Sequence, residues 1–165
     1  MLIRTAQLAN LPELLEIYNY EVLNGIATLD LTPQTYEQRQ EWFQEHASVH
    51  HPLICALTDG GTVAGYASLS PYRSKEAYSS TVELSVYVSP HFRRRGVATQ
   101  LMEHILDMAR ADRELRTVVS VITSGNEAST RLHERFGFRY CGTIPDVAVK
   151  FGNSVSIDNF MLSVI

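Results

Sequence analysis

The sequence lacks the cysteine pattern of a disulfide-rich or zinc-binding protein. Its two cysteines, Cys55 and Cys141, lie far apart and belong to no Cys-x-x-Cys pair or Cys/His spacing. The adjacent histidines His50 and His51 have no acidic or cysteine residue beside them at the spacing of metal ligands. The pattern therefore predicts free thiols and no metal cofactor.

The sequence also lacks long apolar runs and an excess of basic residues. No stretch approaches the roughly 18–20 apolar residues that a membrane helix needs, and the N-terminal residues lack the apolar core of a signal peptide. The formal net charge is −4, whereas nucleic-acid-binding domains are usually basic over a whole face. We therefore expect a soluble, cytoplasmic protein with no nucleic-acid or membrane partner.

What is present is the composition of a single globular domain. The chain has 165 residues, of which 45% are hydrophobic and 19% charged, a length and balance that allow one sizeable core. No repeat, linker or low-complexity segment divides it. The sequence predicts one domain over residues 1–165.

Periodicity and turn residues predict the element order β-α-α-β-β-β-α-β-α-β-β. Helices are expected to begin at Asn10, at Thr32-Pro33, after Gly96 and at Asn126. The near-continuous apolar character of residues 116–123 predicts a strand covered on both faces. The predicted strands are residues 2–8, 53–58, 62–70, 82–88, 116–123, 139–144 and 155–164, with a short extended piece at 26–31. This order predicts an α/β fold, a mixed sheet with helices on both faces.

One stretch, residues 81–104, joins a strand to an amphipathic helix through a turn that holds three consecutive arginines and Gly96. The first N–H groups of a helix lack partners and carry partial positive charge, so an anion is stabilised there. Gly96 lets a ligand approach the backbone closely, and guanidinium groups match phosphate oxygens well. Neither a Walker A loop nor a three-glycine dinucleotide loop is present. The turn predicts a pyrophosphate site; the alternative is an exposed basic turn that only caps the helix.

The turn, Arg93-Arg94-Arg95-Gly96-Val97-Ala98, resembles the Arg/Gln-x-x-Gly-x-Gly/Ala signature of the GNAT superfamily of N-acetyltransferases. Stretches over nearly the whole chain are similar to the phosphinothricin and methionine sulfoximine acetyltransferases of that superfamily. The resemblance implies the GNAT fold, with a mostly antiparallel central sheet, and transfer of acetyl from acetyl-CoA to the α-amine of a small amino-acid analogue. The stretches are Ile17-Tyr18-Asn19, Ala27-Thr28, Gly65-Tyr66-Ala67, Tyr72-Arg73 with Ala77-Tyr78, residues 81–88, Asn126 with Ser129, Leu132-His133-Glu134, Gly137-Phe138, Gly142 and Lys150-x-Gly152-Asn153.

The resemblance implies that acetyl-CoA binds along the central strand, the arginine turn and the last helix. A bulge in the strand is expected to free backbone N–H groups for the pantetheine and the thioester oxygen. Asn126 is expected to contact the pantetheine amides, to cap its helix, or both. The predicted acetyl-CoA-binding residues are Val86, Tyr87, Val88, Arg93, Arg94, Arg95, Gly96, Val97, Ala98, Thr99, Asn126 and Ser129.

Glu83 is the predicted general base. It is a single carboxylate on the central strand, on the side opposite the apolar row, where partial burial raises a carboxyl pKa toward useful values. The alternative is a solvated or salt-bridged strand residue, and direct and water-mediated proton transfer both stay open.

The resemblance places His133 where many members of the wider fold carry a tyrosine. His133 is therefore a candidate acid or hydrogen-bond partner for the leaving sulfur, or a satisfied helix histidine.

The acceptor is expected to meet Arg73 and Lys75, which precede Glu83 and suit a carboxylate, with Tyr78 and Thr81 beside them. Plain surface charge is the alternative. The chain departs from the closest family pattern, which usually has arginine at the position of Lys75 and a tryptophan shortly after Gly152. Lysine binds a carboxylate as a point charge and not bidentately, so this departure bears on the identity of the acceptor.

Two alternative functions would also involve binding of acetyl-CoA or another acyl-CoA. The acceptor is alternatively a polyamine, an antibiotic or a protein N-terminus, although Arg73 and Lys75 disfavour a polycation. A non-catalytic acyl-CoA-binding module would keep the arginine turn without using Glu83. The resemblance also implies a homodimer, with contact through the C-terminal strands.

Overall fold

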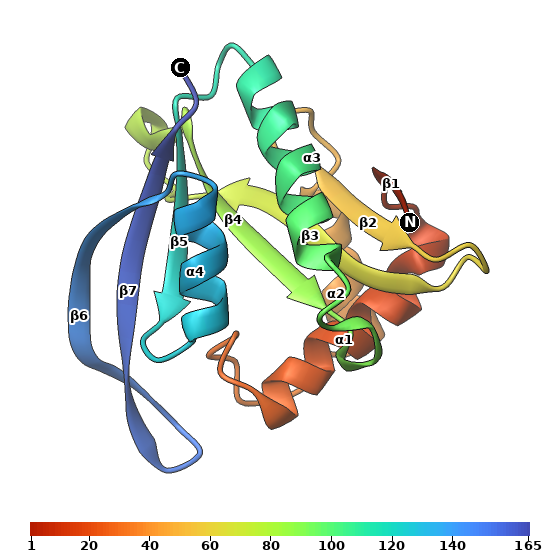
Figure 1. The fold of residues 1–165 in the computed structure, drawn as a ribbon, viewed down its shortest axis with the longest axis horizontal. Coiled ribbons are helices and arrows are strands. Elements are labelled where there is room, and N and C mark those ends of the chain that lie inside the picture. Colours follow the sequence, from red (N-terminus) through yellow and green to blue (C-terminus); the bar gives the residue numbers. More distant parts are fainter.

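The computed structural model describes residues 1–165 and contains one seven-stranded sheet in the order β1-β2-β3-β4-β5-β7-β6 (Figure 1). All neighbouring strands are antiparallel except β4 and β5, which are parallel. No helix has the length and apolar character needed to cross a bilayer. The strands are β1 (Leu2–Thr5), β2 (Leu53–Leu57), β3 (Val63–Pro71), β4 (Thr81–Val88), β5 (Thr117–Thr123), β6 (Arg139–Lys150) and β7 (Asn153–Ser163), and the helices are α1 (Leu11–Asn24), α2 (Tyr36–Glu45), α3 (Val97–Ala111) and α4 (Glu127–Arg135).

Helices cover both faces of the sheet (Figure 1). The apolar stripe of α3, which includes Leu101 and Ile105, packs on one face in a core that extends from Ile54 on β2 to Phe160 on β7. Leu132 of α4 packs against the same core. On the other face, α1 packs with β2 and β3 in a smaller core. The predicted α/β fold with helices on both faces is confirmed, as is the element order.

The parallel strands β4 and β5 pair only at their beginnings, from Thr81 opposite Thr117 to Glu83 opposite Val119. Beyond Glu83 they diverge, so the β5-side edge of β4 is left without a strand partner. On the other edge β4 pairs with β3 without a register shift as far as Val88. The predicted bulge is therefore wrong: strand divergence, and not an extra residue, leaves backbone groups of β4 unpaired.

Several element boundaries also differ from the prediction. Residues 26–31 form no strand, and β1 ends at Thr5. Helix α2 begins at Tyr36 because Thr35 caps it in a reciprocal pair with Gln38. Val121 of β5 is 38% exposed, so that strand is not covered on both faces. Strands β6 and β7 form one long hairpin, which turns at Phe151 and Gly152 with φ angles of 52° and 75°.

Candidate active site

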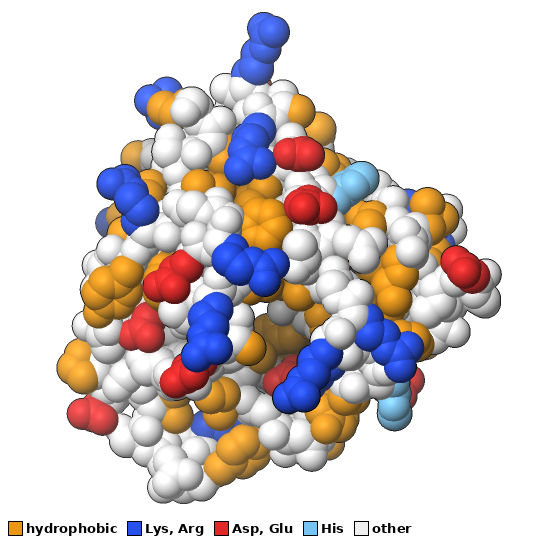
Figure 2. Space-filling view, in the orientation of Figure 1, with side chains coloured by type: hydrophobic (Ala, Val, Ile, Leu, Met, Phe, Trp, Pro, Cys, Tyr) orange, Lys and Arg blue, Asp and Glu red, His pale blue; other side chains and the backbone are white.

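A cavity of about 780 Å³ lies where β4 and β5 diverge. Alternation along β4 places Glu83, Ser85 and Tyr87 on the face of α1, and Leu84 on the face of α3. Residues of both sets line the cavity, so it reaches both faces through the opening between the strands. Figure 2 shows a hollow in the face covered by α3 and α4, with several Lys and Arg side chains around it. The charge around the hollow suits an anionic ligand.

The predicted pyrophosphate turn adjoins the α3 side of this cavity. Gly96 stands at the N-cap of α3 with a φ of 75°, and no side chain caps the helix. Arg94 is also left-handed, with a φ of 60°. Because no side chain occupies the helix N-terminus, its first N–H groups are available to an anion. Ala98 lines the cavity, whereas Arg94, Arg95, Gly96, Val97 and Thr99 lie beside it and outside its lining.

The three arginines of the turn have different surroundings. Arg93 lines the cavity, but its guanidinium forms an ion pair with Glu21 of α1. Arg95 lies over the ring of Phe92, with 5.5 Å between its Cζ and the ring centroid. Arg94 and Arg95 are exposed and form no ion pair with a carboxylate. Of the three, Arg94 and Arg95 have guanidinium groups that are not already bound to an acidic residue.

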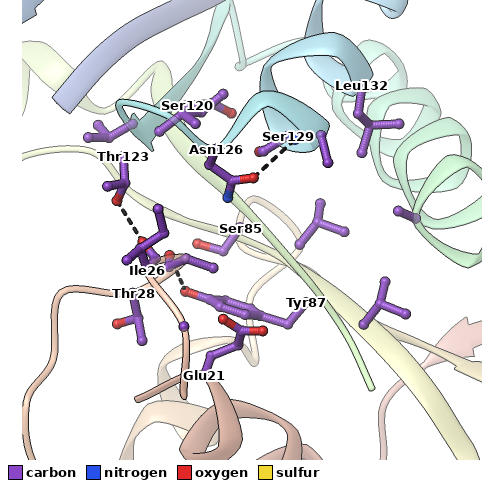
Figure 3. A pocket seen from close by; sticks show the side chains of 18 of the residues that line it. Glu21, Ile26, Thr28, Ser85, Tyr87, Ser120, Thr123, Asn126, Ser129 and Leu132 are labelled. Atoms are coloured by element: carbon purple, nitrogen blue, oxygen red, sulfur yellow. Dashed lines mark hydrogen bonds between the residues drawn. The ribbon is translucent and has the colours of Figure 1, made fainter. Parts of the chain in front are cut away.

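Helix α4 supplies a second cluster to the same side of the cavity. Asn126 caps the helix, because its Oδ1 accepts a hydrogen bond from the N–H of Ser129 at 3.3 Å. Figure 3 shows its side chain at the cavity wall. Val86, Tyr87 and Val88 of β4 line the opposite wall. The predicted N-cap is confirmed, and Asn126 also lies where it can contact a ligand.

His133 is buried beside this cluster and lines the cavity. Its Nδ1 lies 2.7 Å from the carbonyl oxygen of Ser129. Because a carbonyl oxygen only accepts, Nδ1 carries the proton and the neutral ring has a lone pair at Nε2. Burial lowers the pKa of His133, so the imidazole is neutral near pH 7. This geometry suits a hydrogen-bond acceptor and not a proton donor at Nε2.

Glu83 is half-buried on the α1 side of the cavity and forms no ion pair. Burial raises the pKa of its carboxyl above the usual value of 4.5, because desolvation disfavours the charged form. The side chain lies at the last residue that pairs β4 with β5. The carboxylate therefore sits at the point where the two strands separate.

Tyr87 is held by an aromatic cluster on the same face. Its ring stacks on Tyr66 at 5.3 Å between centroids and meets Tyr18 edge-on at 5.6 Å. Arg39, which is 3% exposed, donates a hydrogen bond to the Tyr66 hydroxyl at 2.5 Å. Burial raises the pKa of Tyr87 well above its usual range. Its hydroxyl therefore stays protonated, and it donates a hydrogen bond to the Ala27 carbonyl oxygen at 3.4 Å.

The predicted acceptor-binding residues lie outside the cavity lining. Arg73 is exposed and stacks against Tyr72 and Tyr78, with its Cζ 5.0 and 5.6 Å from their ring centroids. Lys75 is exposed, and Thr81 is half-buried at the start of β4. The single chain thus brings Glu83, His133, Asn126 and the arginine turn together around the cavity, whereas Arg73, Lys75, Tyr78 and Thr81 do not line it.

Sequence reasoning missed the segment that closes the cavity on the α1 side. Gly25, Ile26, Ala27, Thr28 and Leu29 all line it, together with Glu21 at the end of α1. Ala27-Thr28 supported the family resemblance but was given no role. The segment has no strand or helix periodicity, so no pattern within it indicated its place in the site.

Comparisons with known proteins show the family of the chain. Residues 15–138 match the acetyltransferase (GNAT) family. An L-methionine sulfoximine/L-methionine sulfone acetyltransferase of Pseudomonas aeruginosa is 40% identical over 161 residues, which cover 98% of this chain and 93% of the relative. A phosphinothricin N-acetyltransferase of Streptomyces coelicolor is 39% identical, with 87% and 84% covered.

A solved structure has the same fold. The GNAT superfamily phosphinothricin acetyltransferase of Sinorhizobium meliloti, in complex with acetyl-CoA, superposes with a TM-score of 0.94 at 30% identity. The match covers 98% of this chain and 87% of that one. The chain therefore belongs to the GNAT family and is an N-acetyltransferase.

Proposed function

We propose that the enzyme transfers the acetyl group of acetyl-CoA to the α-amine of a small amino-acid analogue of the methionine sulfoximine or phosphinothricin type, with Glu83 as general base. The observation that carries the proposal is the half-buried carboxyl of Glu83, with its raised pKa, at the opening between β4 and β5. The names of the relatives support the substrate class.

The α3 side of the cavity fits acetyl-CoA. The uncapped N-terminus of α3 suits the pyrophosphate, and Arg94 and Arg95 add charged donors. Asn126 and Ser129 face the route from this turn to the opening, where they suit the amides of pantetheine. The unpaired edge of β4 at Val86 to Val88 offers backbone N–H groups to the thioester oxygen. One such donor contributes roughly 3 kcal/mol to transition-state stabilisation.

The acceptor amine approaches from the α1 side. Near pH 7 an α-amine is mostly protonated and not nucleophilic, so a base must take its proton. Glu83 is ionised above its raised pKa and accepts the proton directly or through a water. The nitrogen then attacks the acyl carbon, the bond between carbon and sulfur breaks, and the thiolate leaves.

His133 is assigned no acid role at the leaving group. Its Nδ1–H is donated to the Ser129 carbonyl, so Nε2 of the neutral ring has no proton to give to the sulfur. Thiolates are good leaving groups, so no acid is required. The predicted contacts of Arg73, Lys75, Tyr78 and Thr81 with the acceptor stay a prediction.

The test is release of CoA by the purified protein with acetyl-CoA and a panel of amines. We expect turnover with methionine sulfoximine, methionine sulfone and phosphinothricin, and little or none with spermidine or a peptide. Turnover confined to spermidine or a peptide would overturn the acceptor class. Binding of acetyl-CoA without turnover on any amine would overturn the catalytic role of Glu83.

The proposal includes a homodimer formed through the outer surface of β6 and β7. This hairpin exposes a row of apolar side chains that a single chain leaves uncovered. They are Tyr140, Ile144, Val147, Val149 and Phe151. Light scattering after size exclusion tests it: we expect a dimer for the wild type and a monomer for Val149→Glu, and a monomeric wild type would contradict the proposal.

A further inference from the structure

The segment between α1 and α2 has no strand partner, yet it forms the cavity wall on the acceptor side. Its carbonyl oxygens at Ile26, Ala27 and Thr28 accept hydrogen bonds from side chains of three different strands. Thr123 Oγ1 of β5 donates to the Ile26 oxygen at 2.6 Å, and Tyr87 of β4 donates to the Ala27 oxygen at 3.4 Å (Figure 3). Lys150 Nζ of β6 donates to the Thr28 oxygen at 2.7 Å. Three consecutive carbonyls are thus satisfied without secondary structure.

Lys150 is the most unusual of these donors because it is 2% exposed. Lysine is almost never buried so completely unless it is paired. Its Nζ donates to the Thr28 carbonyl and, at 3.3 Å, to the carbonyl of Glu21 near the end of α1. A cation is favourable there because helix C-termini carry partial negative charge. Lys150 therefore connects the end of α1 to the segment that follows it.

Lys150 also connects that segment to the β6–β7 hairpin. It is the last residue of β6, directly before the left-handed turn at Phe151 and Gly152. Thr123 is the last residue of β5, on the other side of the opening. The acceptor wall is therefore fixed from both the β5 end and the β6 end, by residues about 100 or more positions away in sequence.

From this geometry we infer that Thr123 and Lys150 are positioning residues for the acceptor. They hold residues 25–29 as a wall opposite Glu83 and thereby set the affinity for the amine, without touching acetyl-CoA. The inference rests on the proposed function, because it assigns the α1 side of the cavity to the acceptor. The longer contact from Tyr87 contributes less to the wall than the two short ones.

The experiment compares matched variants. Thr123→Val removes the hydroxyl at nearly constant shape, and Thr123→Ser keeps it. Lys150→Met removes the ammonium at similar length, and Lys150→Arg keeps a positive charge. Thr62→Val, at an exposed turn residue, is the control. The first readout is hydrogen exchange of the peptide that covers residues 25–31, and the second is the KM for the acceptor and for acetyl-CoA together with kcat.

We expect faster exchange of this peptide in Thr123→Val and Lys150→Met, with near wild-type exchange in Thr123→Ser. The acceptor KM is expected to rise roughly five-fold in Thr123→Val and ten- to hundred-fold in Lys150→Met, because a donor that is charged contributes more. The KM for acetyl-CoA should stay within about two-fold of wild type, because neither side chain donates a hydrogen bond to acetyl-CoA. If Lys150→Met does not fold, the comparison of Thr123→Val with Thr123→Ser decides whether the inference holds.

Unchanged exchange of the peptide in Thr123→Val would overturn the inference, as would faster exchange with an unchanged acceptor KM. A fall in kcat alone, with both KM values unchanged, would assign these residues a merely structural role and also overturn it. Hydrogen exchange needs no substrate. A failed acceptor panel would therefore overturn the proposed function while the exchange result still decides whether Thr123 and Lys150 hold the wall.

Discussion

The two sides of the cavity are built in different ways. The α3 side uses mainly contiguous backbone: the end of β4, the turn at Gly96 and the start of α3 follow one another within about 20 residues, and the start of α4 adds Asn126 and Ser129. The α1 side is assembled from α1, residues 25–29, β4, β5 and the end of β6. Recognition of the donor thus depends mainly on local backbone geometry, whereas recognition of the acceptor depends on side chains that meet only in the folded chain.

Glu83 lies on the α1 side, at the opening that joins the two sides, and its loss gives the largest expected effect. We expect Glu83→Gln to lower kcat by roughly 100- to 10,000-fold while the dissociation constant of acetyl-CoA is unchanged. Because burial raises its pKa, the ionised form is disfavoured in the folded state and the folded protein binds the extra proton more readily. As pH rises and Glu83 ionises, the free energy of unfolding therefore falls. Glu83→Gln, which cannot ionise, should be at least as stable as wild type.

The pH profile of the wild type gives an independent check of Glu83. The rate should fall as pH drops through the raised carboxyl pKa, above 4.5, and this limb should be absent from the residual activity of Glu83→Gln. Glu103→Gln, at an exposed position of α3, serves as the control. A fall in acetyl-CoA affinity equal to the fall in kcat would place Glu83 in donor binding instead.

Gly65→Ala tests the α3 side. A Cβ at this position of β3 would lie 2.7 Å from the carbonyl oxygen of Tyr87 and 3.2 Å from side-chain atoms of Val97 and Leu101. Either the backbone of β4 or the start of α3 must move, at a cost of about 1–3 kcal/mol in the free energy of unfolding. We expect weaker acetyl-CoA binding, measured by calorimetry, and a lower melting temperature.

Gly60→Ala is the matched control for that substitution, because its Cβ would meet only Thr58 Oγ1 at 3.8 Å. An unchanged acetyl-CoA affinity in Gly65→Ala would show that the turn does not depend on the packing of α3 against β3.

Gly25→Ala tests the α1 side. Its Cβ would lie 1.9 Å from Oε2 of Glu21, so this carboxylate must turn away from its ion pair with Arg93. The backbone at Gly25 is extended and accepts alanine, and the obstacle is the end of a flexible side chain. We therefore expect a smaller loss of stability than for Gly65→Ala, roughly 1 kcal/mol, with a raised acceptor KM.

The outcome for Gly25→Ala separates the two sides directly. A raised KM for acetyl-CoA with an unchanged acceptor KM would mean that Glu21 serves the arginine turn and not the acceptor wall. Gly60→Ala again supplies the control.

The smallest effect is expected for a substitution of His50, which lies away from both sides of the cavity. His50, before β2, lies 2.6 Å from Asp112 and 3.2 Å from Glu114, after α3. The hydrogen bond to Asp112 raises the pKa of His50 above 6.5. A histidine whose pKa is raised by folding stabilises the protein at pH values below its pKa in the unfolded state. This stabilisation is lost as pH rises through its pKa in the folded state. We expect His50→Gln to lower the melting temperature slightly at about pH 6 and not at about pH 8.5, with both KM values unchanged.

The α3 side was largely predictable because its signals are local. The alternation of Val82, Leu84 and Val86, the glycine at the helix N-cap and the stripe from Leu101 each have a period or a turn chemistry of their own. Asn126 was likewise predicted as a cap, and its bond to Ser129 confirms it. Side-chain partners were not predictable: the ion pair of Arg93 with Glu21 spans 72 residues.

The α1 side was mostly unpredictable because its geometry depends on long-range contacts. Residues 25–29 have no periodicity, and their place is fixed by Thr123 and Lys150. The divergence of β4 from β5 depends on the packing of the whole sheet, and a local bulge was predicted in its place. Arg73 and Lys75 were chosen for charge and proximity to Glu83 in sequence, and the structure places both in the connection between β3 and β4, outside the cavity lining. Their contact with the acceptor stays a prediction.

The short pairing of β4 with β5 also divides the sheet into two units. Strands β1 to β4 on one side and β5, β7 and β6 on the other share only three residue pairs in the sheet. The larger core joins the two units on the α3 face, whereas the smaller core lies within the first unit alone. A molecule of acetyl-CoA that contacts both β4 and α4 would cross-link the units. Its binding should therefore make thermal unfolding more cooperative as well as raise the melting temperature.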